Sequence, residues 1–194
     1  MTLILASTSA IRRALLEQAG VPFTTERPDI DEARIEAAYA GQDFELALSL
    51  AESKAAKVST QHPGDWVIGG DSVVSVEGRR FMKPRDRDDA ADHLRFFSGK
   101  AMRLVSAVAL AKGGEVQWNH ISDAVLNVRS LSEDFIRAYL DAEWPEVAYC
   151  VGVFRMEARG VTLFDDVEGN HFTILGLPLL PLLGALRERG LMAS

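Results

Sequence analysis

A short apolar strand followed at once by a helix opens the chain, and this order constrains the fold most strongly. Residues 2–6, with four consecutive apolar side chains, predict a buried strand, and the apolar spacing of residues 9–19 predicts a helix that Gly20 ends. The turn between them holds hydroxyl groups, free helix-start amides and guanidinium groups, which suit an anion such as a phosphate. A serine helix cap beside solvent-exposed arginines is the simpler alternative for these side chains, which are Ser7, Ser9, Arg12 and Arg13.

Strand and helix patterns alternate along the rest of the chain. The predicted helices are residues 43–59, 86–97, 132–141 and a last one from Pro178 to Gly190. The predicted strands are residues 66–68, a hairpin of 73–76 with 80–82, a long pair of 102–111 with 115–128, and short strands near 147–154, 161–164 and 171–175. This alternation predicts an α/β protein with a mixed sheet. A chain of 194 residues without repeat or flexible linker fits one domain over 1–194, or two tightly joined lobes.

Composition excludes several classes of protein. A formal net charge of −7 argues against a nucleic acid polymer as partner, because such binding needs a basic face. No apolar run reaches the ~18 residues of a membrane span, and the first residues lack the features of a signal peptide. The single Cys150 excludes an internal disulfide and suits a reducing compartment. We therefore expect a cytoplasmic protein without a membrane partner.

Two charged residues stand where apolar or turn residues are the norm. Lys54 falls in the middle of the apolar arc of the helix 43–59, where a lysine is costly unless an anion meets it or its stem reaches water. Asp71 follows the strand 66–68 and two glycines, and ligands of open α/β sheets gather at the carboxyl ends of strands. A turn aspartate is the alternative for Asp71.

Further charged side chains complete an inventory that suits phosphate chemistry. Lys83 lies just past a predicted strand, and Glu32 is either a helix-start acid or a metal ligand. The four histidines lack metal-ligand spacing, and neither GxxxxGK[ST] nor GxGxxG occurs, which argues against zinc, P-loop and Rossmann sites. Hydroxyls, arginines, lysines and carboxylates near strand ends are suited to Mg²⁺-assisted attack of water on a phosphoanhydride.

An ordered set of motifs over essentially the whole chain resembles the Maf family of nucleoside triphosphate pyrophosphatases. Each motif alone is weakly specific, and their order along the chain gives the resemblance its weight. The motifs are Leu3-Ile4-Leu5-Ala6-Ser7-Thr8-Ser9 with Arg12-Arg13, Asp29-Ile30-Asp31-Glu32, Ala51-x-x-Lys54-Ala55, Ile68-Gly69-Gly70-Asp71-Ser72, Lys83-Pro84, Ser98-Gly99-Lys100, Leu131-Ser132 and Gly176-Leu177-Pro178-Leu179.

The resemblance implies an elongated α/β fold in which a mixed sheet flanked by helices forms two lobes around a central cleft, as in ITPase-like proteins. It also implies a homodimer that hydrolyses a nucleoside triphosphate to the monophosphate and pyrophosphate with Mg²⁺ or Mn²⁺. In this resemblance, Asp71 matches the catalytic carboxylate of the family. Asp71 and Glu32 both match its metal ligands. Positions that match its phosphate- and metal-handling residues are Ser7, Ser9, Arg12, Arg13, Glu32, Lys54 and Lys83. A nucleotide-binding regulator of cell division with little activity and a phosphatase that releases orthophosphate are the alternatives.

Three positions match those that sort family members by substrate: Ile11, Ser72 and Glu157. The segment that ends at Glu157 resembles the subgroup acting on 7-methyl-GTP, which has Glu at this position where the dTTP/UTP subgroup has Gln. A carboxylate suits guanine, because it accepts from the guanine edge and complements a cationic ring. Ile11 lacks the aromatic ring of that subgroup, and Ser72 is nearer the dTTP/UTP subgroup, which is the alternative. Departures from the family pattern are Ala10, Met82 and Val151.

Overall fold

The computed structural model describes residues 2–39 and 42–193, which form two compact units. The first unit takes in the chain up to Ser72, Val105–Ser122 and the chain from Asn170 onward. The second unit comprises Val73–Leu104 and Asp123–Gly169.

The predicted α/β class with a mixed sheet and flanking helices is confirmed. The strands are β1 (Leu3–Ala6), β2 (Thr24–Glu26), β3 (Trp66–Val76), β4 (Arg79–Phe81), β5 (Ala101–Lys112), β6 (Glu115–Val128) and β7 (Phe164–Gly169). The helices are α1 (Ala10–Gln18), α2 (Glu32–Ala38), α3 (Asp43–Gln61), α4 (Arg87–Phe97), α5 (Glu133–Glu143), α6 (His171–Ile174) and α7 (Leu179–Glu188), with the 3-10 turns η1 (Glu146–Tyr149) and η2 (Arg159–Leu163). Hydrogen-bonded neighbours follow the order β2-β1-β3-β5-β6-β7, and β4 pairs with β3 off that path.

In the first unit, β1 runs parallel to both β2 and β3 and is buried throughout. Its register with β3 ends at the pair Ala6 and Gly69. A strand buried on both faces needs apolar residues at every position, which explains the unbroken apolar run at the start of the chain. The chain then turns at Ser7 into α1, so the carboxyl end of β1 lies level with the middle of β3.

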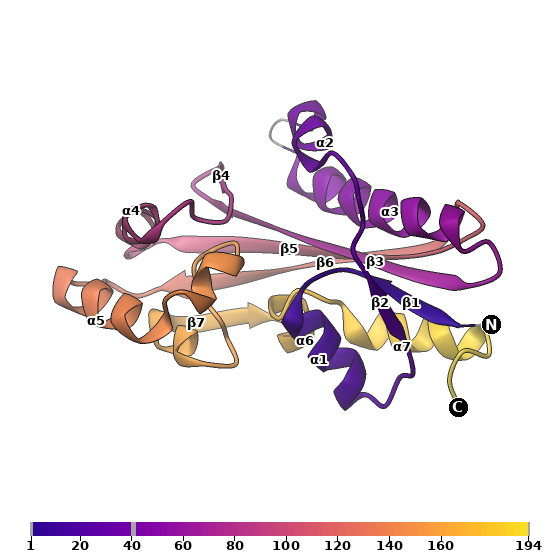
Figure 1. The fold of residues 1–194 in the computed structure, drawn as a ribbon. Helices are drawn as coiled ribbons and strands as arrows, with labels where there is room; N and C mark the ends of the chain where they lie inside the picture. Colours follow the sequence, from indigo (N-terminus) through magenta and orange to yellow (C-terminus); the bar gives the residue numbers. More distant parts are fainter. Residues whose placement is uncertain (1, 40–41, 194) are drawn as a thin grey trace. The chain divides into compact units, whose positions relative to one another are not determined.

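Helices cover both faces of this parallel part of the sheet, with α3 on one face and α1 and α7 on the other (Figure 1). The approach of α3 to β3 depends on Gly69, because a Cβ there would lie 2.1 Å from the Ala51 carbonyl oxygen and 2.7 Å from the Ala55 nitrogen. The next residue faces the opposite side: a Cβ at Gly70 would lie 3.4 Å from Nε of Arg12 in α1. Gly69 therefore lets α3 come close to the strand, whereas Gly70 is in ordinary contact with the side chain of Arg12.

In the second unit, β4 folds back antiparallel on β3 through a tight turn at Glu77 and Gly78, both with positive φ, as a type I′ hairpin requires. β7 pairs antiparallel with β6. Helices α4 and α5 lie against each other, and the ion pair of Arg95 with Glu133 links them. Ser132 caps α5 by accepting from the backbone N–H of Phe135.

Several sequence-based boundaries are wrong. Residues 66–76 form one continuous strand, so Asp71 lies inside β3 and not beyond its end. The predicted strands near 147–154, 161–164 and 171–175 are instead the turn η1 with irregular chain, the turn η2 with the start of β7, and the helix α6. Short apolar runs do not distinguish a strand from a buried turn or a single helical turn, which explains these errors. The short helix α2 was not predicted as an element.

No helix in the described part of the chain is long and apolar enough to cross a membrane.

Candidate functional site

A buried ammonium group between two carboxylates is the most unusual feature of the first unit. Lys54 is only 7 % exposed, and its Nζ lies 2.5 Å from Oδ1 of Asp71 and 2.9 Å from Oε1 of Glu32. The side chain of Asp71 is itself 13 % exposed, whereas that of Glu32 is half-exposed. Charges so far from water attract each other strongly, and the two carboxylates offset the cost of burying Lys54.

The three charged side chains come from three elements. Lys54 lies on the buried face of α3 with Leu50, as its position in the apolar arc predicts. Asp71 lies in β3 two residues beyond Gly69, where the register with β1 ends, so it stands near the carboxyl end of β1. Glu32 is the first residue of α2, directly after the cap Asp31. Asp71 therefore lies near the carboxyl end of β1 and not at the end of β3, the strand that carries it.

Arg12 is fixed by two hydrogen bonds on the opposite face of β3. Its Nε donates to the carbonyl oxygen of Gly176 at 2.7 Å, and its Nη2 donates to Oγ of Ser72 at 3.1 Å. Burial lowers the pKa of the Arg12 guanidinium from its ordinary value, while the charges of Asp71 and Glu32 act in the opposite direction. Arginine stays protonated under any normal condition, so this is a partly buried positive charge.

A hollow of about 200 Å³ opens at the start of α1. Ser9 caps the helix by accepting from the backbone N–H of Arg12, and Oγ of Ser7 accepts from the N–H of Ser9 at 3.1 Å. Arg13 is exposed and pairs with Glu17 at 3.5 Å. A helix start with a basic rim suits an anion. The residues that line the hollow are Ser7, Thr8, Ser9, Ala10, Arg13, Thr25, Glu26 and Arg27.

Sequence reasoning missed the part of this hollow that β2 supplies. Thr25, Glu26 and Arg27 reach it because β2 pairs in parallel with β1. The signal available in the sequence was the short extended piece before the loop at Pro28, but it does not reveal its sheet partner.

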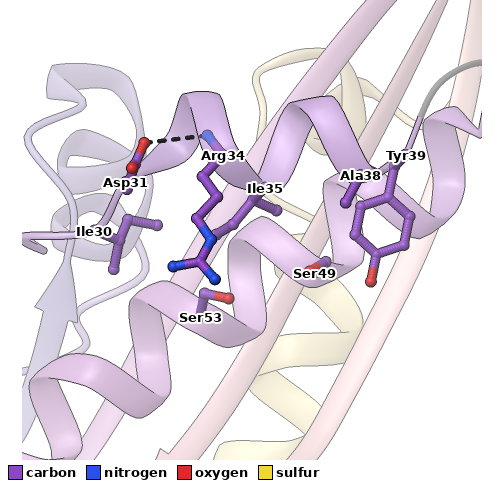
Figure 2. A pocket seen from close by; sticks show the side chains of 8 residues that line it. All are labelled: Ile30, Asp31, Arg34, Ile35, Ala38, Tyr39, Ser49 and Ser53. Atoms are coloured by element: carbon purple, nitrogen blue, oxygen red, sulfur yellow. Dashed lines mark hydrogen bonds between the residues drawn. The ribbon is translucent and has the colours of Figure 1, made fainter.

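A second hollow, of about 500 Å³, lies between α2 and α3 (Figure 2). Its lining mixes apolar and polar groups, and the guanidinium of Arg34 points from α2 towards Ser53 on α3 (Figure 2). Its walls include sequence neighbours of Glu32 and Lys54, although neither of these two side chains lines it. The lining residues are Ile30, Asp31, Arg34, Ile35, Ala38, Tyr39, Ser49 and Ser53.

The second unit carries two further sequence-predicted residues. Lys83 is exposed just after β4, and Glu157 is exposed in the irregular segment before η2. This segment is anchored two residues earlier, where Nε and Nη2 of Arg155 donate to Oε2 of the buried Glu143 at 3.0 and 2.9 Å. Of the other specificity positions, Ile11 is half-buried on α1.

Glu32 and Asp71 have the donor chemistry of a Mg²⁺ site. Mg²⁺ in nucleotide enzymes is held by one or two carboxylates together with substrate phosphates. Both carboxylates reach the same ammonium group, so their oxygens converge. Within residues 2–39 and 42–193, no group of three or more His, Cys, Asp or Glu side chains forms a complete metal cage. The residues therefore fit a metal that a phosphate ligand helps to hold.

The family model and the two sequence relatives below match nearly the full length of the chain. The family model described as Maf-like protein matches residues 2–189. A 7-methyl-GTP pyrophosphatase of Rhizobium etli is 47% identical over 97% of this chain and 96% of its own. A nucleoside triphosphate pyrophosphatase of Nitrobacter hamburgensis is 46% identical over 98% of this chain and 95% of its own. A solved structure of a nucleoside-triphosphatase (dITP/XTP pyrophosphatase) of Mycobacterium abscessus matches 68% of this chain and 76% of its own, at a TM-score of 0.36 and 18% identity.

Proposed function

The chain belongs to the Maf-like protein family, and from this membership we propose that it hydrolyses a nucleoside triphosphate to the monophosphate and pyrophosphate. The observation that carries the proposal is the buried contact of Lys54 with Asp71 and Glu32 in a chain this similar to pyrophosphatases. A cation and two carboxylates are suited to phosphoanhydride hydrolysis, because they can stabilise phosphate charge and orient the attacking water.

Asp71 is the proposed general base. Its carboxylate accepts a proton from the attacking water, the water oxygen bonds to the α-phosphorus, and the bond from that phosphorus to the bridging oxygen breaks, so that pyrophosphate leaves. The ammonium group of Lys54 contacts Oδ1 of Asp71 at 2.5 Å and so holds the carboxylate in place before the reaction.

Phosphate binding falls to the groups at the carboxyl end of β1. We assign the triphosphate to Ser7, Ser9 and the free amides of α1, with Arg12 and Arg13 neutralising its charge. The family resemblance adds Lys83 as a phosphate-handling residue. Positive groups near the transferring phosphoryl group stabilise the charge of the transition state.

Glu32 and Asp71 are the proposed ligands of Mg²⁺ or Mn²⁺. When bound, the metal supplies neutralisation of phosphate charge and activation of water. Support comes from their carboxylate chemistry and from their proximity, since both contact the Lys54 ammonium group that lies between them.

The proposed base is guanine, in 7-methyl-GTP or another modified nucleotide. Two relatives that act on 7-methyl-GTP by name are 47% and 44% identical to this chain. Glu157 supports the proposal, since a carboxylate matches the donors of a guanine edge. dTTP or UTP is the second candidate, favoured by Ile11, which offers no aromatic partner to a cationic ring.

The proposal extends to a cytoplasmic homodimer, on the grounds of the family resemblance and of the single cysteine. Size-exclusion chromatography with light scattering measures the oligomeric state directly.

Product analysis tests the proposed function. The purified protein is incubated with 7-methyl-GTP, GTP, UTP and dTTP in the presence and absence of Mg²⁺ or Mn²⁺. Monophosphate plus pyrophosphate is the expected result. Release of orthophosphate would identify a phosphatase instead, and no product from any nucleotide would favour a binding protein with a regulatory role.

A further inference from the structure

A chain of hydroxyl groups leads from Arg12 into the core of the first unit. Nη2 of Arg12 donates to Oγ of Ser72 at 3.1 Å, and that oxygen lies 2.9 Å from Oγ of Ser106. Oγ of Ser106 in turn donates to the carbonyl oxygen of Thr173 at 2.8 Å. Ser106 is fully buried in β5, where a hydroxyl is costly unless it is hydrogen-bonded.

The number of protons on each hydroxyl group decides which residue donates in each of these hydrogen bonds. A serine hydroxyl has one proton to donate, and an arginine donates only. Ser106 gives its proton to Thr173, so it accepts in its bond with Ser72. Ser72 therefore donates inward to Ser106, and its outer lone pairs face Arg12. The contact from Ser72 to the Gly176 carbonyl is longer, at 3.5 Å.

The second anchor of Arg12 fixes the plane of its guanidinium. Nε donates to the Gly176 carbonyl oxygen at 2.7 Å. Gly176 has a φ of +90°, a backbone conformation that residues with a side chain rarely adopt. In the part of the chain that the structure describes, no acceptor bonds to Nη1 of Arg12. The two anchors thus hold the guanidinium at Nε and Nη2, and Nη1 keeps its donors for a further partner.

We propose that Ser106 is a positioning residue, which orients Ser72 as an acceptor so that Arg12 is held ready for the triphosphate. This rests on the proposed function, in which Arg12 binds phosphate. It also gives Ser72 a role that was not predicted: Ser72 sets the position of Arg12, because its proton is committed to the core and is not offered to a base.

The test is a double-mutant cycle between Ser106→Ala and Arg12→Ala. A positioning residue loses its effect once the residue it positions is gone, whereas a purely structural defect adds to the loss. We expect Ser106→Ala alone to lower kcat/KM about tenfold, and to have little further effect in the Arg12→Ala background. An equal loss in both backgrounds would overturn the proposal.

Ser122→Ala is the matched control. The hydroxyl of Ser122 bonds to Oγ1 of Thr173 at 2.8 Å, in the same core, but it is not in the chain that ends on Arg12. Its removal leaves kcat/KM unchanged if the proposal holds, whereas a loss equal to that of Ser106→Ala would refute it. Ser106→Cys, which keeps a weak donor of similar size, should restore part of the activity.

Two further measurements keep the outcome clear. Ser72→Ala breaks the same chain at a less buried position, and it should show the same non-additivity with Arg12→Ala even where Ser106→Ala does not fold. Affinity for inorganic tripolyphosphate, measured by calorimetry for every variant, separates positioning from catalysis. Absence of turnover in the wild type would reject the proposed function alone, and the tripolyphosphate cycle would still decide the role of Ser106.

Discussion

At the scale of single residues, Asp71 carries the charge that the proposed reaction needs. Its Oδ1 contacts the Lys54 ammonium at 2.5 Å, and its side chain is largely buried. Asp71→Asn keeps the shape and removes the charge, so we expect pyrophosphate release to fall by more than about 100-fold while the protein stays folded. Initial rates with the preferred nucleotide, together with circular dichroism, measure both outcomes.

Asp65→Asn is the control for this substitution. Asp65 precedes β3 and accepts from the backbone N–H of Thr2, a bond that an amide oxygen also makes. We expect its rate to equal that of the wild type. A folded Asp71→Asn protein with near wild-type activity would remove Asp71 from the mechanism.

Glu157 decides the base in the proposed function. A carboxylate accepts two guanine donors and complements a methylated ring, whereas glutamine offers the donor and acceptor that a uracil or thymine edge needs. We expect Glu157→Gln to lower kcat/KM for 7-methyl-GTP about tenfold or more relative to that for UTP. Kinetics with 7-methyl-GTP, GTP, UTP and dTTP measure this ratio, and Glu146→Gln is the control in the same unit. A wild type that prefers UTP or dTTP, with no change in the mutant, would exclude Glu157 as the base-reading residue.

The sequence predicts some residues of the site far better than others. Lys54 could be placed on the buried face because helical period alone sets its direction. Ser106 and Thr173 could not be linked to Arg12, because they come from segments far apart in the chain that only the folded sheet brings together. Single polar residues in apolar strands give no sign of which partner satisfies them.

At the scale of elements, the contact of α3 with β3 positions Lys54 against Asp71. Gly69 allows this contact, since a Cβ there would meet the Ala51 carbonyl at 2.1 Å. Backbone atoms cannot move aside as a side chain can, so Gly69→Ala must push α3 away. We expect it to destabilise the protein by about 3 kcal/mol or more and to reduce activity strongly. Urea denaturation and initial rates measure the two effects.

Gly64→Ala is the matched control on the same segment. No atom lies within 4 Å of a Cβ at Gly64, and its φ is not in the left-handed region. We expect a change in stability within about 1 kcal/mol and no change in rate. Wild-type stability in Gly69→Ala would show that α3 does not depend on this close approach.

Long elements with a capping residue or a glycine turn at their ends are predicted correctly from the sequence, whereas the short ones over 147–175 are not. Helices α3, α4 and α5 have long periodic patterns, and Ser132 and Asp86 mark two of their starts. The long strands β5 and β6 have a Gly113-Gly114 turn between them. The segment 147–175 was misread because its short apolar runs are buried in 3-10 turns and a single helical turn, whose burial depends on tertiary contacts.

At the scale of the whole molecule, the pyrophosphatase assignment depends on segments spread over the full length of the chain. Arg12 near the start is held by Gly176 near the end, and Lys54 meets Asp71 across two elements. A truncation on either side therefore removes a partner of the proposed phosphate site. This explains why composition and single motifs leave the activity open while the ordered set of motifs over the chain identifies the family.

Stability of the molecule should also depend on pH through one buried histidine of the second unit. His93 packs against the rings of Phe81 and Phe97, and its Nδ1 is buried without a hydrogen bond to any described residue. Burial lowers the pKa of His93 from its ordinary value, and neighbouring charges adjust it in both directions. These charged neighbours are Asp89 and Asp92, which raise the pKa, and Arg79 and Arg85, which lower it.

The sign of the effect follows from proton uptake. Below about pH 6.5 the unfolded chain protonates His93, whereas the folded protein does so only at lower pH. The unfolded state then binds more protons, so the free energy of unfolding decreases as the pH falls through this window. We expect the Tm of the wild type to drop more between pH 7.5 and pH 5.5 than that of His93→Phe, which keeps a ring among Phe81 and Phe97 but cannot titrate. Differential scanning calorimetry at both pH values measures the difference, and an identical drop in the two proteins would show that His93 does not contribute to the pH dependence.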